Sequence, residues 1–266
     1  MCGRVRLSSD VSEIKIAFRI PPDRPTPNIA PSWNVAPTDP LPVVRYDAKD
    51  HQRALEVMRW RLVPFWAKDI KVGFANINAK AEGIEKKPAF REAFQRRRCL
   101  VPVDSFYEWK RIDGGKQPYA IGLHGGGLMA LAGLWETWRA RPSGERVRSF
   151  AIVTTEPNEL CAQLHNRMPV VLAPEAWQAW LGEEPADEAQ LKSLVPYSSG
   201  GMVCWPVSQR VGNVKNNDPS LIEPFAVGCI EGTAGVGFRD DRKSPQADRS
   251  PTNPGSPRRG FLFDAC

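Results

Sequence analysis

The chain has 266 residues, a mass of 29.6 kDa, 42% hydrophobic residues and a formal net charge of +6. This length and composition suffice for one domain with a full-sized hydrophobic core. The sequence has no signal-peptide-like apolar run at its start and no stretch near the roughly 18 apolar residues that span a membrane, so we expect a cytoplasmic protein without a membrane partner.

Cysteines and histidines give no sign of a metal site. The six cysteines and three histidines are dispersed, and no Cys-x-x-Cys pair is present. Neither a zinc site nor a disulfide scaffold is indicated, and we expect no metal and no organic cofactor. Cys99, Cys161, Cys204 and Cys229 lie in apolar surroundings, which predicts that they are core thiols.

The first part of the chain predicts a strand, a helix and an irregular connection. A short strand is expected over 3–7, and Ser8 or Ser9 is expected to begin a helix whose apolar side chains recur at helical spacing from Val11. A proline-rich connection over 21–42 follows.

The next part of the chain combines strands and helices without a repeated strand-helix unit. Asp113-Gly114-Gly115 is a turn signal that joins two of the strands as a hairpin. Strands are predicted over 42–46, 55–62, 99–103, 106–110, 117–123, 128–135, 148–154 and 202–207, and helices over 89–97, 157–164 and 174–181. This pattern predicts the α+β class, as a strand-rich single domain with peripheral helices rather than a doubly wound sheet.

The composition changes near residue 231. Residues 1–230 are predicted to form one catalytic domain, whereas residues 231–266 are rich in Gly, Pro, Ser, Arg and Asp and lack aliphatic periodicity. Such a segment buries too little apolar surface to order itself, so a disordered C-terminal tail is predicted.

Met1-Cys2 can give the chain a reactive amino terminus. Removal of Met1 leaves Cys2 with an α-amine and a thiol on adjacent carbons, and an aldehyde can form an imine with the amine and then a thiazolidine ring with the sulfur. Gly3 permits close approach of a substrate, and Arg4 adds a cation. Many proteins nevertheless begin Met-Cys without chemical consequence.

Basic and aromatic residues are interleaved between residues 59 and 98. Aromatic faces beside cations are typical of surfaces that bind single-stranded nucleic acid. The alternative is a solvated face above core aromatics. The basic members are Arg59, Arg61, Lys68, Lys71, Lys80, Lys86, Lys87, Arg91, Arg96, Arg97 and Arg98, and the aromatic ones are Trp60, Phe65, Trp66 and Phe74.

Six separated motifs occur in an order that resembles the SOS response-associated peptidase (SRAP) family, whose members shield abasic sites in single-stranded DNA. The resemblance runs from Cys2 to about Phe225. It implies an SRAP-type fold with a DNA-binding cleft. The motifs are Met1-Cys2-Gly3-Arg4, Trp33-Asn34-Val35-Ala36-Pro37, Asn76-Ile77-Asn78-Ala79-Lys80-Ala81-Glu82, Ser105-Phe106-Tyr107-Glu108-Trp109, Leu164-His165-Asn166-Arg167-Met168-Pro169 and Val211-Gly212-Asn213-Val214-Lys215.

The resemblance implies four catalytic residues. Glu108 lies between two aromatic residues, where a partly desolvated carboxyl can exchange a proton with an amine, or where it is an exposed strand residue. His165 lies in a place suited to a loop-borne acid or base, although a single histidine is more often packed or exposed without a role. By the resemblance, Glu108 is catalytic and His165 donates a proton to the deoxyribose. Asn78 holds the sugar or the Cys2 amine.

The resemblance also implies a set of DNA contacts. Lys80 stands where the family usually has arginine, which keeps the charge but loses the bidentate fork. Cations hold flanking phosphates, exposed rings wedge or stack bases, and the remaining members shape the pocket. The implied DNA-binding residues are Arg4, Asn34, Phe65, Trp66, Lys80, Thr154 and Arg167.

The expected function is covalent cross-linking to abasic sites in single-stranded DNA through a thiazolidine on Cys2, by a monomer that is nucleoid-associated when bound. The family label adds a cysteine peptidase or hydrolase activity in autoprocessing, and the cross-linking chemistry is lyase-like. Two alternatives stay open: an N-terminal nucleophile glutamine amidotransferase-like hydrolase, which a glutaminase assay detects, and a noncatalytic single-strand binding module, which predicts reversible, salt-sensitive binding.

Overall fold

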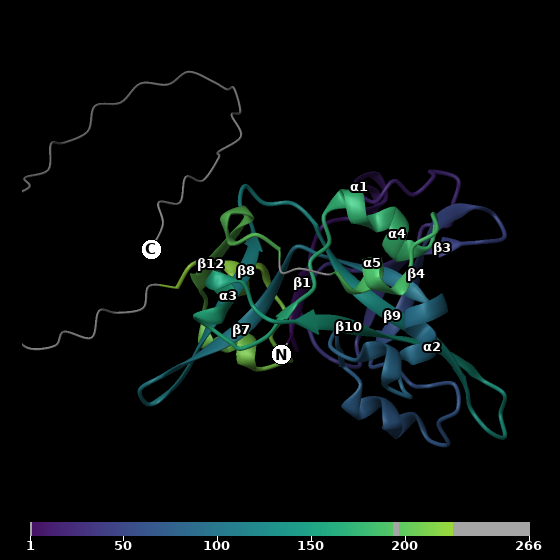
Figure 1. Ribbon diagram of the computed structural model, residues 1–266. Coiled ribbons are helices and arrows are strands. Elements are labelled where there is room, and N and C mark those ends of the chain that lie inside the picture. Colours follow the sequence, from purple (N-terminus) through teal and green to yellow (C-terminus); the bar gives the residue numbers. More distant parts are fainter. Residues whose placement is uncertain (1, 194–196, 226–266) are drawn as a thin grey trace, which may run out of the picture. The chain divides into compact units, whose positions relative to one another are not determined.

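The computed structural model describes residues 2–193 and 197–225, and these residues have the predicted α+β, strand-rich architecture (Figure 1). The predicted disordered tail, residues 231–266, lies outside the described residues, as does Cys229. Two sheets carry the strands of the described chain, and short helices lie around them.

Five strands close into a barrel. Their order is β10-β4-β3-β6-β9, and β9 pairs in turn with β10, so the ring closes and its strands are protected from edge-to-edge pairing. Phe150 on β10 lies opposite Trp60 on one neighbour and Trp135 on the other. The barrel strands are β3 (Pro40–Asp47), β4 (Gln52–Trp60), β6 (Arg98–Val103), β9 (Met129–Arg139) and β10 (Arg146–Thr155).

Two very short strands extend the end of β10. β5 (Asn78–Lys80) runs parallel to it and sets Lys80 opposite Thr154, while β11 (Met168–Pro169) runs antiparallel and sets Pro169 opposite the same residue. Segments this short carry no periodicity of their own. They are strands because β10 offers them hydrogen-bonding partners, and the sequence did not predict them.

The second sheet has the order β12-β8-β7-β1-β2. The predicted hairpin is confirmed, because β7 and β8 pair antiparallel around a turn in which Gly114 has a φ of 81°. The proline-rich connection predicted over 21–42 contains a strand that the sequence did not predict, β2, which pairs with β1. The strands are β1 (Val5–Leu7), β2 (Ser32–Val35), β7 (Ser105–Ile112), β8 (Gly115–Leu123) and β12 (Met202–Pro206).

Alternate residues of β7 face two different hydrophobic cores. Phe106 belongs to the main core, whereas Tyr107 belongs to a smaller core that also contains Val211. Because residues two apart share a face of a strand, Glu108 points to the same side as Phe106. Cys2 is also part of the main core, so the two sequence-predicted catalytic groups lie on one side of the sheet.

The helices are short. The predicted helix over 157–164 contracts to one turn, and the one over 174–181 begins as a 3₁₀ turn. The helices are α1 (Val11–Ala17), α2 (Arg91–Arg96), α3 (Glu159–Ala162), α4 (Trp177–Leu181) and α5 (Glu188–Lys192), and the 3₁₀ turns are η1 (Ile70–Ala75), η2 (Ile84–Lys86), η3 (Pro174–Ala176), η4 (Ser199–Gly201), η5 (Gln209–Gly212) and η6 (Pro219–Ile222). No described helix combines the length and the apolar character that a membrane span requires.

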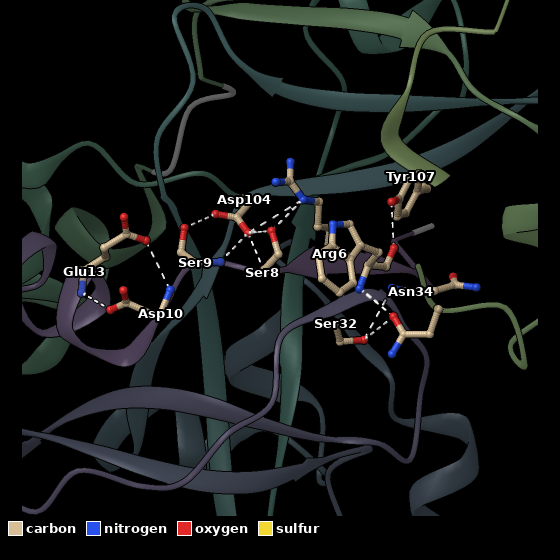
Figure 2. Close-up of polar contacts among 11 residues, drawn as sticks. Arg6, Ser8, Ser9, Asp10, Glu13, Ser32, Asn34, Asp104 and Tyr107 are labelled. Carbon is tan, nitrogen blue, oxygen red and sulfur yellow. Dashed lines mark hydrogen bonds and ion pairs between the residues drawn. The ribbon is translucent and has the colours of Figure 1, made fainter. Parts of the chain in front are cut away.

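The first helix begins at Asp10, so the predicted start at Ser8 or Ser9 is wrong. Asp10 Oδ1 accepts a hydrogen bond from Glu13 N at 2.9 Å, and the Glu13 carboxylate accepts one from Asp10 N at 3.1 Å, which forms a capping box. Both serines instead bind the carboxylate of Asp104, with Ser8 N and Ser9 Oγ each donating at 2.5 Å (Figure 2). Asp104 therefore anchors the chain directly after β1.

Candidate active site

Cys2 lies just before β1 and is fully buried. Its carbonyl oxygen accepts a hydrogen bond from Asn78 Nδ2 at 2.8 Å. Asn78 is placed by β5, whose pairing with β10 sets it opposite Ile152. The two chain segments, 76 residues apart in sequence, thus meet at Cys2.

The pairing of β1 with β7 brings Glu108 to the same place. Tyr107 N donates a hydrogen bond to Arg4 O at 3.0 Å, so the residues before Arg4 run beside Glu108. Glu108 is buried, with 5% of its surface exposed. Burial raises the pKa of the Cys2 thiol, and the charge of Glu108 raises that pKa further. The thiol is therefore neutral at neutral pH.

Only one of the two polar atoms of the Asn78 side chain has a hydrogen-bond partner among the described residues. Its Nδ2 binds Cys2, whereas its Oδ1 is buried and accepts no hydrogen bond from the residues that the structure describes. A buried acceptor without a donor is uncommon and costly, so it marks a place where a substrate hydroxyl or an amine N–H can bind. Cys2, Asn78 and Glu108 are called the inner cluster below.

His165 follows α3 and is half-buried. Its Nδ1 accepts a hydrogen bond from Arg167 N at 3.0 Å, which in the neutral imidazole places the proton on Nε2. Its backbone N–H donates to Cys161 O at 2.9 Å. The pKa of the Cys161 thiol is raised to about 12 by burial first, and the charges of Cys204 and Glu108 add to this. Cys161 is thus bound to the His165 backbone and is influenced by the charge of Glu108.

A hollow of about 580 Å³ lies beside His165. Among the four residues predicted to be catalytic, only His165 lines the part of this hollow that the structure describes. The hollow gives the imidazole access to a bound group of sugar or nucleotide size. Its lining residues are Glu156, Pro157, Ala162, Leu164, His165 and Asn166.

Half-buried Arg4 and buried Asn34 form one polar unit. The Arg4 guanidinium donates to Asn34 Oδ1 and to Val211 O, both at 2.7 Å, and lies 5.9 Å from the centroid of the Trp109 ring. Asn34 Nδ2 donates to the backbone of the segment after η5, with Asn216 O at 2.7 Å. Burial lowers the pKa of Arg4. Because Asn34 is 3% exposed and its amide binds protein at both ends, any role toward DNA passes through the groups that it positions.

Arg167 and Thr154 are joined at the end of β10. Arg167 donates to the Thr154 carbonyl at 2.5 Å, and its two terminal nitrogens also bind the carboxylate of Glu82. Thr154 is fully buried, so its predicted contact with DNA stays a prediction that depends on Arg167. Lys80, opposite Thr154 across the strand pair, is exposed.

Phe65 and Trp66 are the sequence-predicted aromatic contacts, and both are on the surface. They are 52% and 50% exposed. Trp66 Nε1 donates to Pro88 O at 3.4 Å, which ties the ring to the basic segment that precedes α2. Large exposed rings beside cations are suited to stacking on bases. Five residues outside the inner cluster are together called the outer face below: Phe65, Trp66, Lys80, Glu82 and Arg167.

Two residues near the site had no role in the sequence predictions. Glu82 belongs to the motif around Asn78, and its charge next to a cation-rich segment was the signal that could have pointed to a partner. Cys161 carried no signal beyond its apolar surroundings, because its proximity to Glu108 depends on the packing of α3. Within residues 2–193 and 197–225, no three His, Cys, Asp or Glu side chains are grouped so as to hold a metal ion.

The sequence defines a family. Residues 1–214 match the family described as SOS response associated peptidase (SRAP). The chain is 42% identical over 225 residues to the abasic site processing protein YoqW of Bacillus subtilis, covering 84% of this chain and 99% of that protein. It is 31% identical over 229 residues to the abasic site processing protein HMCES of Gallus gallus, covering 74% and 67%. The chain belongs to the SRAP family, which confirms the resemblance.

Solved structures support the fold. The X-ray structure of a protein from Bacteroides thetaiotaomicron, 24% identical in sequence, superposes with a TM-score of 0.76 over 84% of this chain and 100% of that chain. A protein from Bordetella bronchiseptica, 23% identical, superposes with a TM-score of 0.67 over 78% and 100%. At these identities the likeness establishes the arrangement of strands and helices.

Proposed function

We propose that this protein processes abasic sites in single-stranded DNA by linking its Cys2 covalently to the damaged sugar, after removal of Met1. The single observation that carries the proposal is the inner cluster, in which buried Cys2 is held by Asn78 and lies in the field of buried Glu108. The relatives' description as abasic site processing proteins supplies the substrate class.

In the proposed reaction the amine and the thiol of Cys2 both form bonds to the aldehyde carbon of the sugar, and one water is lost. The Cys2 amine nitrogen adds to the aldehyde carbon of the ring-opened sugar, and the resulting carbinolamine loses its hydroxyl as water to give an imine. The sulfur then adds to the imine carbon while the thiol proton moves to the nitrogen, which closes the thiazolidine. Both new bonds between the protein and the DNA, one from nitrogen and one from sulfur, are bonds to the former aldehyde carbon.

The side chains around Cys2 supply the proton transfers. Glu108 accepts a proton from the α-ammonium group, returns it to the departing hydroxyl, and then accepts the proton that the iminium nitrogen loses to give the imine. When the sugar opens, the C1 hydroxyl proton passes through solvent to the ring oxygen, and His165 Nε2–H donates a hydrogen bond to that oxygen. Asn78 Oδ1 accepts an N–H of the amine and so orients its lone pair.

The environment of the thiol sets the order of the two steps. Burial and the Glu108 charge raise the pKa of the Cys2 thiol, so the sulfur is a neutral S–H while the amine attacks. Sulfur attack on the aldehyde is thereby disfavoured before the imine forms. In the imine the carbon is already held beside the sulfur, and ring closure is intramolecular.

The outer face and Arg4 bind the strand. Arg4, Lys80 and Arg167 hold phosphates, and Phe65 and Trp66 stack on bases beside the lesion. This binding reads no sequence, as an enzyme that meets lesions at random requires. We expect a monomer acting on DNA in the cytoplasm. Any peptidase activity implied by the family description is confined in this proposal to the release of Met1.

An abasic oligonucleotide tests the proposal. Processed protein incubated with a single-stranded oligonucleotide carrying one abasic site should give a heat-stable one-to-one adduct, with a mass equal to the sum of the partners minus one water. Cys2→Ala should give none. Cys99→Ala, which removes a buried thiol on β6 of the barrel, should react normally. An adduct of undiminished yield in Cys2→Ala, or one formed equally well with Met1 retained, refutes the proposal.

A further inference from the structure

One of the three cations predicted to hold DNA phosphates, Arg167, is already paired with an anion of the protein. Arg167 donates to the two carboxylate oxygens of Glu82, through Nη1 at 2.8 Å and Nη2 at 2.9 Å. This end-on, two-bond geometry is the one by which a guanidinium recognises a carboxylate or a phosphate. A phosphate oxygen pair and the Glu82 carboxylate therefore compete for the same edge of Arg167.

The two partners differ in how firmly the fold holds them. The Arg167 side chain is 14% exposed, and its Nη2 also donates a hydrogen bond to the Thr154 carbonyl at 2.5 Å. Glu82 is 51% exposed and stands just after β5, before Gly83, whose φ of 67° turns the chain into η2. Removal of the carboxylate thus leaves the guanidinium anchored to β10, whereas Glu82 can swing into solvent.

We propose that Glu82 occupies the place of a backbone phosphate on Arg167 in the DNA-free protein, and that a phosphate of the bound strand displaces it. The exchange replaces one ion pair by another. Because the Glu82 side chain is half exposed, the ion pair contributes little to folding stability, and its loss is readily offset by the new contact. Arg167 holds the pKa of Glu82 below its usual value, so the carboxylate is ionised throughout the neutral range.

This competition lowers affinity for undamaged strands. Without Glu82, a phosphate that binds Arg167 releases a condensed counterion, and the binding constant falls with salt accordingly. With Glu82 in place, the phosphate must first displace a tethered anion. Because the covalent link does not depend on continued phosphate binding, a protein that forms it loses little by binding intact DNA weakly. Glu82 thus sets the protein's preference against undamaged strands by competing with phosphate for Arg167. This role rests on the function proposed above.

Glu82→Gln tests the inference, since it keeps the shape and removes the charge. The measurement is reversible binding to an intact, fluorescein-labelled single-stranded oligonucleotide by anisotropy, from 50 to 300 mM salt. We expect the variant to bind about five- to tenfold more tightly at the lowest salt, with a log–log salt slope like that of the wild type, because a phosphate binds Arg167 in both complexes and only the displacement of Glu82 is spared. Adding Arg167→Gln should abolish the gain.

The chain offers a matched control at the turn between β3 and β4. Arg24 and Asp50 form an exposed ion pair at 2.5 Å, with side chains 16% and 52% exposed, nearly the values of Arg167 and Glu82. Asp50→Asn makes the same change in net charge. It should shift affinity by less than half as much as Glu82→Gln. An equal shift would mean that net charge alone explains the result, and the inference would be wrong.

The opposite result also decides the question. If Glu82 serves instead to orient Arg167 for phosphate, then Glu82→Gln binds intact strands more weakly or no more tightly than the wild type, and the inference fails. Glu82→Ala should give the same direction as Glu82→Gln and guards against an artefact of the amide. Adduct formation on the abasic strand is scored separately. If Glu82→Gln forms the adduct normally but binds intact strands no more tightly, only this inference is wrong. If the variant binds more tightly but neither it nor the wild type forms an adduct, the proposed function is wrong.

Discussion

One short strand, β5, carries residues of both the inner cluster and the outer face, and the two regions differ in how their polar groups are held. In the inner cluster, Asn78 is tied to a backbone carbonyl of a fully buried residue. On the outer face, two residues further along, Lys80 is exposed, and the nearby Arg167 is paired with a carboxylate that is half in solvent. The inner region is built for fixed geometry, and the outer one for exchange of partners.

The energetic reason for this difference is burial. A buried hydrogen-bonding group that loses its partner costs about 1–3 kcal/mol, whereas an exposed ion pair is worth about 0–1 kcal/mol and is weakened by salt. Chemistry at Cys2 and affinity for the strand should therefore be separable by mutation. The expectations below test that separation.

The largest effect is expected for Asn78→Ala. The variant leaves the Cys2 carbonyl without its donor and removes the free Oδ1, so the amine loses its orientation. Adduct formation should slow by about 10- to 100-fold. Affinity for the intact strand should stay within about twofold, since the outer face is unchanged. Single-turnover adduct kinetics and anisotropy measure the two quantities. A parallel loss in both would show that the two regions are one unit.

An intermediate effect is expected for Trp66→Ala. The exposed ring offers a stacking surface, and the loss of one stacked base costs about 1 kcal/mol, or about fivefold in affinity for single-stranded DNA. The adduct yield at saturating DNA should be unchanged. Ile16→Ala, which trims a 79% exposed apolar side chain on α1, is the control and should bind normally. Equal affinities for both variants would remove Trp66 from the DNA surface.

The smallest effect is expected for the pH dependence of stability that the buried thiol of Cys161, on α3, produces. The pKa of Cys161 is raised from 9.0 to about 12 in the folded protein, so the neutral thiol stabilises the fold below pH 9 and this contribution is lost as pH rises toward 12. For one thiol the free energy of unfolding should fall by about 0.7 kcal/mol between pH 8.5 and 9.5.

Denaturant titrations at the two pH values check this expectation. Cys161→Ala should have a pH dependence that is shallower by that amount. Leu160→Ala on the same helix also loses apolar contacts but no titrating group, so it should keep the wild-type dependence. An identical dependence in wild type and Cys161→Ala would show that the thiol is solvated.

Much of this protein could be read from residue patterns. Alternating apolar residues and a turn at Asp113 predicted the β7-β8 hairpin, and most barrel strands were located within a few residues. Six motifs in order indicated the family, which the match over residues 1–214 confirms. These features are local, because periodicity, turn chemistry and motif identity are contained in short stretches of sequence.

Tertiary structure decided what depends on distant partners. The serines expected to begin α1 are bound by Asp104, which lies 95 or more residues away, so Asp10 caps the helix instead. β2, β5 and β11 are strands only because β1 and β10 pair with them. Glu82 and Arg167 are 85 residues apart, and no local pattern indicates that they meet. A short segment has too few interactions of its own to fix its structure or its partners, and the folded chain supplies the rest.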